Sequence, residues 1–186
     1  MRPQGEEKFS LGGKLLFAHP SLRDPHFRRA ILFISSHEES EGAFGVVINR
    51  PTHQKLQDLV GEPALPSLAG VPVYEGGPVS SDELILMAFL GEKGAVPTAF
   101  QLPISLTDAE EILREGRGFV RAFRGYAGWG AGQLEGELQQ NAWFVKEVDA
   151  EVMIGEPDQK SWLRFMKSQG PAYYLLALAP DDPSLN

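Results

Sequence analysis

The stretch AILFISSHEESEGAFGVVINRP, residues 30–51, carries the strongest fold signal in this chain of 186 residues. Its two apolar runs, AILFI and GVVI, are short and rich in β-branched and aromatic side chains, which favours strands over helices. Successive positions in both runs are apolar, so both faces of each strand need cover. We therefore expect two central strands, over residues 30–35 and 44–48, in a sheet that is covered on both sides.

Short apolar runs of the same kind predict further strands around this pair. They lie at residues 14–18, 71–74, 84–89, 143–148, 151–154 and 172–179, with one more strand containing Phe119 and Phe123 and an edge segment over 99–104 that Pro103 interrupts. Amphipathic spacing and end signals predict helices over residues 55–60, from a capping box at Thr107 to Gly116, over 133–141, and from Pro157 to Gly170. Strands and helices mix without strict βαβ alternation, so we expect an α/β protein of α+β-like type with a mixed sheet.

Length and composition fit a single soluble domain. At roughly 150 residues per domain, the chain predicts one domain over residues 1–186, with loose termini at 1–12 and 181–186. The absence of cysteine excludes disulfides, thiolate nucleophiles and Cys-ligated metals. Charged residues interrupt the N-terminal segment where a signal peptide would be apolar, and no window approaches the ~20 apolar residues of a membrane span. We therefore expect a cytoplasmic protein that does not bind membranes.

The charge balance argues against nucleic acid as a partner. Seventeen Lys and Arg residues against 25 Asp and Glu residues give a net charge of −8, which disfavours non-specific binding to nucleic acid. The concentrated basic stretch, Arg114, Arg117, Arg121 and Arg124, has acidic residues at 110, 111 and 115 nearby. We interpret this stretch as a solvated surface of paired charges.

Two polar segments adjoin the expected strands near the start of the chain. The loop AHPSLRDPHF, residues 18–27, is stiffened by two prolines and presents Arg23, Asp24 and His26, or else Asp24 caps backbone N–H groups in a turn. In GVVINRP, residues 45–51, the polar pair Asn49 and Arg50 follows a buried strand. Arg50 either clamps a carboxylate or phosphate group or pairs with a nearby acidic side chain, Asp24 or Glu75.

Two further segments are rich in glycine. In EGGPV, residues 75–79, Gly76 and Gly77 allow close approach of the backbone to a ligand or to another loop. In GYAGWGAGQLEGEL, residues 125–138, glycines 125, 128, 130 and 132 are expected in a turn between a strand and a helix. This turn either forms an anion-binding nest of N–H groups or lets Trp129 pack tightly, and it lacks both the dinucleotide fingerprint and the P-loop pattern.

These four segments together define the predicted ligand site. We expect their loops to meet in a surface groove, with Arg50 as the anchor for an anionic group and Gln133 or the 128–132 backbone as further donors. The residues of this predicted site are Asp24, Asn49, Arg50, Gly76, Gly77, Gly128, Trp129, Gly130 and Gln133.

Catalytic patterns are weaker than binding patterns in this chain. There is no G-x-S-x-G elbow, no H-E-x-x-H pair and no calcium loop. The acid–base candidates are Asp24, His26, His37 and Glu135. We expect neither a metal nor a cofactor, and an enzyme would need two of these four side chains within hydrogen-bond reach at one pocket.

The same four segments resemble the bacterial YqgE/AlgH family. The resemblance rests on GKLLFAHPSLRDPHFRRAILFI, GAFGVVINRP, VYEGGPVSSDELILM and GYAGWGAGQLEGEL with a later Trp143, in this order over nearly the whole chain. It implies an α/β fold built on a bulged mixed sheet that curls into a pseudo-barrel with helices packed around it. The loop after His37 is more acidic than the family usually has.

The resemblance gives an architecture but no catalytic residue to carry over. One branch of the family is named for a link to the regulation of alginate production, and some members carry the label of transcriptional regulator. We expect a non-enzymatic binding or regulatory module whose partner is a small anionic ligand or a protein. The alternative is a hydrolase or transferase acting on a small anionic metabolite, and a direct DNA-binding regulator ranks last.

Overall fold

The computed structural model of this chain describes residues 10–60, 66–92, 94–155 and 157–179. Its strands are β1 (Lys14–Ala18), β2 (Ile31–Glu38), β3 (Gly42–Val47), β4 (Pro51–Lys55), β5 (Pro72–Glu75), β6 (Val79–Leu90), β7 (Ala99–Gln101), β8 (Gly118–Trp129) and β9 (Trp143–Glu147). Its helices are α1 (Leu56–Val60), the 3-10 turn η1 (Pro66–Leu68), α2 (Leu106–Glu115), α3 (Gln133–Gln139), α4 (Ala150–Ile154), α5 (Gln159–Ser168) and α6 (Pro171–Leu178).

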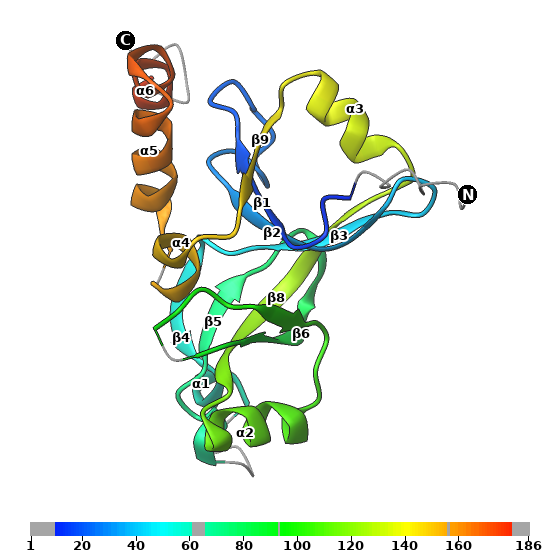
Figure 1. Cartoon of the computed structure of the whole chain (residues 1–186), viewed down its shortest axis with the longest axis vertical. Coiled ribbons are helices and arrows are strands. Elements are labelled where there is room, and N and C mark those ends of the chain that lie inside the picture. The colour runs from blue at the N-terminus through cyan, green and yellow to red at the C-terminus, as the bar shows by residue number, and fades with distance from the viewer. Residues whose placement is uncertain (1–9, 61–65, 93, 156, 180–186) are drawn as a thin grey trace, which may run out of the picture.

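The nine strands of the described residues form one mixed sheet. Seven follow the order β4-β5-β8-β3-β2-β1-β9, while β6 pairs with β8 and β7 pairs with β6. The β5–β8 pair is parallel and the other pairs are antiparallel. A register shift between Ile34 and Ser36 bulges β2 against β3. The sheet curls along the long strand β8 (Figure 1), which confirms the bulged, curled mixed sheet expected from the sequence.

The central strands are buried on both faces, as their continuous apolar runs predict. Strand β2 lies between β1 and β3, and β3 lies between β2 and β8. Along β2, Ile31 and Phe33 enter a core that also contains Trp162 of α5. Their neighbours Leu32 and Ile34 enter a second core on the opposite face. This alternation follows from the period of two in a strand, and it explains why helices are needed on both sides of the sheet.

Two segments predicted as strands are helices. Residues 150–154 form α4, because Asp149 caps its N-terminus by accepting a hydrogen bond from the N–H of Val152. The run AYYLLALA belongs to α6, which has Pro171 in its first turn. A proline at the first helical position and good helix formers such as Ala and Leu favour this helix. A short apolar run without periodicity does not distinguish the two structures.

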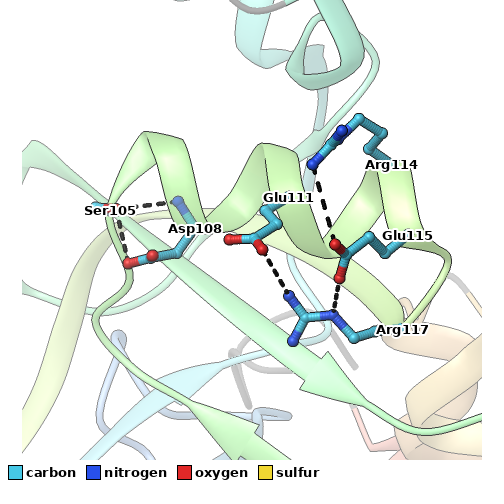
Figure 2. A network of polar contacts seen from close by, with 6 residues as sticks. All are labelled: Ser105, Asp108, Glu111, Arg114, Glu115 and Arg117. Carbon is cyan, nitrogen blue, oxygen red and sulfur yellow. Dashed lines mark hydrogen bonds and ion pairs between the residues drawn. The ribbon is translucent and has the colours of Figure 1, made fainter.

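Other boundaries also differ from the prediction. Helix α2 is capped by Ser105 rather than Thr107, and the Ser105 hydroxyl accepts from the N–H of Asp108 (Figure 2). Its expected end at Gly116 is confirmed, since Gly116 has a left-handed φ of 65°. Pro157 precedes the N-cap of α5, Asp158, instead of opening that helix. The expected glycine-rich turn is shorter than predicted, because β8 continues through Trp129.

Residues 10–12, expected to belong to a loose terminus, are packed into the fold. Leu11 is buried, and its N–H donates to Nδ1 of His37 at 3.3 Å. Residues 10–12 are therefore part of the fold, while the remainder of the two expected loose termini lies outside the described residues. Within the part of the chain that is described, no helix is both long enough and apolar enough to cross a membrane.

Candidate functional site

Asp24 acts as a turn residue in the loop between β1 and β2. Its Oδ1 accepts a hydrogen bond from the N–H of His26 at 2.8 Å, and its carbonyl oxygen accepts from the N–H groups of Phe27 and Arg28. An Asx turn of this kind fixes the loop without a ligand. The structural alternative for Asp24 is therefore the one that the geometry shows.

Asn49 is a buried connector. Its Oδ1 accepts from the N–H of Ile31 at 2.8 Å, and its Nδ2 donates to the carbonyl of Arg29 at 2.9 Å. A further bond to the carbonyl of Asp158, at 3.5 Å, reaches the start of α5. Because the side chain is 1% exposed and satisfied by backbone groups, it ties β2, β3 and α5 together and offers no surface to a ligand.

Arg50 lies half-buried beside the loop between β1 and β2. Its Nη2 donates to the carbonyl of Arg28 at 3.2 Å. Burial lowers the pKa of the Arg50 guanidinium, and the positive charge of Arg28 lowers this pKa further, while Asp24 and Glu75 act in the opposite direction. Arg50 therefore sits among the groups that the sequence associated with it, next to a second arginine that the predicted site did not contain.

Gly76 and Gly77 allow the backbone of their loop to cross strand β8 in contact with it. A Cβ on Gly76 would lie 2.3 Å from the carbonyl oxygen of Gly125, and one on Gly77 would lie 2.2 Å from that of Tyr126. The N–H of Gly76 donates to the Arg124 carbonyl. The connection between β5 and β6 thus crosses β8 in direct contact, which corresponds to the alternative of a close approach to another loop.

The segment from Gly128 to Gln133 lies away from Arg50. In the register of β3 with β8, Gly128 pairs with Phe44 near the start of β3, whereas Asn49 follows its end. At ~3.3 Å per residue, these places are roughly 15 Å apart along the strand. The Gly130 N–H donates to Oε1 of Gln133 at 3.1 Å. The four loops therefore do not all converge on one groove as predicted. Asp24 and Glu75 are close enough to Arg50 to oppose the lowering of its pKa by burial, while the first loop reaches Trp129 through Phe27.

Glu137 of α3 joins two tryptophans. Its Oε2 accepts from the indole N–H of Trp129 at 3.0 Å and from that of Trp143 at 2.7 Å. Phe27 packs against both rings, with centroids 5.9 and 5.8 Å away. Sequence reasoning missed Glu137, because two tryptophans 14 positions apart give no sign that they share an acceptor. The cluster shows that Trp129 packs tightly, but Gly130 and Gly132 have no atom within 4 Å of an added Cβ and are not what allows this packing.

Replacing Glu137 by leucine is expected to lower the free energy of unfolding by about 1–3 kcal/mol, because two half-buried indole N–H groups lose their acceptor. Glu137→Gln keeps a carbonyl oxygen and is expected to cost less than about 1 kcal/mol. Urea unfolding followed by tryptophan fluorescence measures both. Gln139→Leu, at an exposed position of the same helix, is the control. Equal stability of all three variants would show that the shared acceptor contributes nothing.

His37 and Glu135 are the two acid–base candidates that the structure brings together. His37 Nε2 lies 2.6 Å from Glu135 Oε1. Since Nδ1 accepts the N–H of Leu11, the neutral ring carries its proton on Nε2 and donates it to Glu135. Neither side chain is among the described residues that line the three hollows discussed below. His26 is exposed and does not join them.

The basic stretch predicted as paired surface is confirmed at the C-terminal end of α2, for Arg114 and Arg117. Arg117 Nε lies 2.6 Å from a carboxylate oxygen of Glu115, and its Nη2 lies 3.8 Å from Glu111. Arg114 lies 3.9 Å from Glu115, and Figure 2 shows the four side chains grouped at the C-terminal end of α2. Such exposed pairs contribute little to stability. They do make this part of the stretch a poor surface for an additional anion.

Arg121 departs from that prediction. Arg124 pairs with Glu75 at 3.7 Å on the surface, but Arg121 is 3% exposed. Its Nη2 donates to the carbonyls of Met153 and Gly155, each at 2.6 Å. The sequence predicts a strand that contains both arginines but does not show which one faces the core. Which side chain is buried depends on where α4 packs.

A small enclosed hollow of about 170 Å³ lies between the β1–β2 loop and α6. Among the described residues, its charged lining comes from Arg23, Arg28 and Arg29, and its apolar lining includes Leu22, Trp162 and Leu176. We call this hollow the arginine pocket. Of these side chains, sequence reasoning singled out only Arg23. The signal for the others was the pair Arg28-Arg29 in the same loop, but the apolar wall comes from α5 and α6 and depends on tertiary structure.

The arginine pocket rests on a rigid base. Trp162 is 2% exposed, and its indole N–H donates to the carbonyl of Ala18 at 2.8 Å. The Arg29 guanidinium lies 5.9 Å from the Trp162 ring centroid, and its Nη2 donates to the carbonyl of Ala177 at 3.4 Å. Loop, α5 and α6 are thus fixed to one another. In Figure 1 the loop between β1 and β2 and helix α6 occupy the same upper part of the view.

Two larger hollows are wide open to solvent. One of about 830 Å³ lies between the β2 bulge and the segment from Phe100 to Asp108, and one of about 660 Å³ lies beside Gly91 and Arg117. Among their described lining residues, neither gathers several charges of one sign. Among the described residues, no three His, Asp or Glu side chains lie close enough together to hold a metal ion.

The curled mixed sheet, buried on both faces, with its polar groups on connecting loops, defines an α/β protein of pseudo-barrel type. The chain belongs to the AlgH-like family, whose sequence profile matches residues 15–174, and this confirms the resemblance to the YqgE/AlgH family. A UPF0301 protein of Streptomyces avermitilis is 40% identical over 97% of each chain. One from Chlorobaculum tepidum is 32% identical over 94% of this chain and 95% of its own.

Solved structures agree with the fold. The solution structure of the AlgH protein from Pseudomonas aeruginosa superposes with a TM-score of 0.63 at 27% identity, covering 95% of this chain and 98% of that one. The crystal structure of a protein from Corynebacterium diphtheriae superposes with a TM-score of 0.68 at 20% identity, covering 95% of both chains. The second likeness concerns the fold alone.

Proposed function

We propose that this protein is a non-catalytic binding module that recognises a small anionic group, phosphate or carboxylate, in the arginine pocket. The observation that carries the proposal is the gathering of Arg23, Arg28 and Arg29 around one enclosed hollow. Guanidinium groups bind carboxylates and phosphates through paired, charge-assisted hydrogen bonds. The anion therefore lies close to the predicted anchor, Arg50, but on neighbouring arginines.

The electrostatics of the loop support this site. The whole chain has a net charge of −8, yet four arginines lie on or beside one loop, since Arg28 is close enough to lower the pKa of Arg50. The loop is therefore a locally basic region of a net-acidic chain, and a small anion favours such a region.

Addition of inorganic phosphate is expected to stabilise the protein at low ionic strength. At 100 times its dissociation constant, a ligand adds ~2.7 kcal/mol to the free energy of unfolding. For a chain of this size, that raises the Tm by roughly 5–10 °C. Differential scanning calorimetry measures the shift, and isothermal titration calorimetry measures the affinity directly.

A pair of double variants separates specific binding from the general stabilising effect of phosphate, which is excluded from most protein surfaces. Arg23→Gln/Arg28→Gln is expected to weaken phosphate binding at least about tenfold, because charge-assisted hydrogen bonds are lost. Arg114→Gln/Arg117→Gln makes the same change in net charge at the C-terminal end of α2 and is expected to leave binding unchanged. Equal loss in both would show that only overall charge matters.

The acidic residues that follow Ala179 in the sequence need a further control. Asp181 and Asp182 lie outside the described residues. Repeating the titration with Asp181→Asn/Asp182→Asn removes any competition from their carboxylates. Absence of saturable phosphate binding in both the native chain and this variant would contradict the proposal and would favour a protein partner instead.

The other functions have less support. An enzyme acting on a small anionic metabolite has the His37–Glu135 hydrogen bond in its favour, but Nδ1 of His37 is occupied by a backbone N–H. Direct DNA binding and transcriptional regulation have the net charge and the paired arginines of α2 against them. We propose a cytoplasmic location for this module, and we propose no metal or cofactor for it.

A further inference from the structure

Strand β9 forms one edge of the mixed sheet. Among the described strands it pairs with β1 alone, and its register with β1 runs without a shift from Trp143 to Glu147. Natural sheets protect such an edge with a bulge, a proline or a charged side chain, because unpaired N–H and C=O groups attract another strand. Strand β9 contains neither a bulge nor a proline, so its protection depends on its charged residues.

Both charged side chains of β9 take part in ion pairs within the chain. Lys146 pairs with Asp149, which lies just beyond the strand, and Glu147 pairs with Lys14 of β1. Each charge therefore has an opposite charge beside it, which weakens its repulsion of an incoming strand. Val145, next to them, is apolar and 46% exposed. The edge is thus poorly protected against pairing.

Backbone alternation identifies which hydrogen-bonding groups of β9 face outward. The N–H of His19 donates to the carbonyl of Ala142, so Ala142 directs its groups toward the chain that continues from β1. In an antiparallel pair this orientation alternates along the strand. Trp143, Val145 and Glu147 therefore direct their N–H and C=O groups away from β1. Within the part of the chain that the structure describes, these outward groups meet no partner.

We propose that β9 pairs with β9 of a second copy of this chain, in antiparallel orientation about a two-fold axis at Val145. The sheet then continues from one copy into the other. Such an interface is closed, because each copy contributes the same edge. The outward groups of facing residues exchange both of their backbone hydrogen bonds. This inference goes beyond the anion site, since none of the described residues that line the arginine pocket belongs to β9.

The side chains of β9 favour this register. With the axis at Val145, all five residues of the strand are paired. Lys146 then faces Phe144 of the second copy, and an ammonium group beside an aromatic ring is favourable. Glu147 faces Trp143, so no like charges lie opposite each other. Moving the axis along the strand pairs fewer residues, and an axis at Lys146 or Glu147 also places like charges directly opposite, which is destabilising. The edge is therefore complementary to itself.

The dimer is expected to be weak and reversible. Strands of five residues give a small interface compared with the roughly 1,200–2,000 Å² of stable complexes. Sedimentation equilibrium of the native chain, from micromolar to millimolar concentration, is expected to show the average mass rising toward that of two chains.

Substitutions at the axis locate the interface. Val145→Lys is expected to weaken dimerisation about fivefold or more, because two ammonium groups then face each other. Val145→Thr keeps a β-branched side chain and is expected to weaken dimerisation much less. Leu175→Gln alters a residue of α6 that is 67% exposed and is expected to leave dimerisation unchanged. Circular dichroism and Tm confirm that each variant is folded.

A disulfide across the axis tests the register, because the native chain contains no cysteine. Facing residues that exchange hydrogen bonds have Cα atoms ~5.5 Å apart, within the ~4.4–6.8 Å that a disulfide spans. Val145→Cys is therefore expected to form a covalent dimer when treated with oxidised glutathione. Position 147 of one copy lies roughly 14 Å along the strand from position 147 of the other, so Glu147→Cys is expected to remain largely monomeric.

Three results would overturn the proposal. The first is a native chain that stays monomeric at every concentration. The second is a dimer that persists unweakened in Val145→Lys, and its loss in Leu175→Gln would then place the interface on α6. The third is equal cross-linking of Val145→Cys and Glu147→Cys, which would exclude an axis at Val145.

Discussion

Replacing Arg121 by alanine is expected to lower the free energy of unfolding by about 3–5 kcal/mol, a larger loss than the one expected for Glu137→Leu. Nη2 of Arg121 donates to the carbonyls of Met153 and Gly155, each at 2.6 Å. Both carbonyls lie at the C-terminal end of α4, where no intrahelical donor remains. The truncation would leave them unsatisfied and would leave a cavity between β8 and α4.

Aromatic rings add to the effect of this truncation. The guanidinium carbon of Arg121 lies 5.1–5.5 Å from three ring centroids, those of Tyr74, Phe89 and Phe119. A cation desolvated among aromatic faces gains stabilisation from each of them. Arg121→Lys keeps the charge but loses the planar guanidinium group. Its free energy of unfolding is therefore expected to lie between those of the native chain and the alanine variant.

Thermal unfolding measures the change. The expected loss corresponds to a fall in Tm of roughly 6–20 °C for a chain of this size. Arg124→Ala is the matched control on the same strand, because its pair with Glu75 is exposed and is worth at most about 1 kcal/mol. Similar small effects at the two positions would contradict the buried placement of Arg121.

Replacing Gly77 by alanine is expected to destabilise the protein by about 3 kcal/mol or more. Gly77 has a φ of 152°, where a side chain costs roughly 1–3 kcal/mol. Its Cβ would also lie 2.2 Å from the carbonyl of Tyr126 in β8, and backbone cannot move aside as a flexible side chain can. Overpacking of this kind adds about 1–3 kcal/mol.

Control glycines make the measurement specific. Gly130 and Gly70 have no atom within 4 Å of an added Cβ and no left-handed φ, so their alanine variants are expected to stay within about 0.5 kcal/mol of the native chain. Urea unfolding gives the midpoint for all three. A Gly77→Ala protein as stable as the native one would mean that β8 is not crossed at this distance, and ligand binding would again be the better explanation of Gly77.

The sheet could be predicted from sequence where burial leaves a local pattern. The runs AILFI and GVVI are apolar at every position because β2 and β3 separate two cores, so their central placement could be deduced before the structure. The C-terminal run AYYLLALA was wrongly predicted as a strand, because continuous apolar character also occurs in a helix. Helix α6 is apolar around most of its circumference, and a run without periodicity looks like a buried strand.

The candidate site was predicted less well than the sheet. Polar and glycine-rich loops drew attention to Asn49, Gly76 and Gly77, but these residues satisfy backbone groups and steric limits of the fold itself. The arginine pocket depends on how α6 packs over the β1–β2 loop, which places Leu176 beside Arg29, almost 150 positions earlier. No local pattern encodes a contact between segments so far apart.

The measurement that tests the arginine pocket most directly is a phosphate titration followed by two-dimensional ¹H–¹⁵N NMR spectra of the native chain. We predict saturable shifts that are largest for amides of residues 20–29 and 176–179, and that disappear in Arg23→Gln/Arg28→Gln. Saturable shifts centred on residues 128–133 would instead restore the glycine-rich segment as the anion site. Shifts that grow linearly without saturation anywhere would contradict anion binding as the function of this protein.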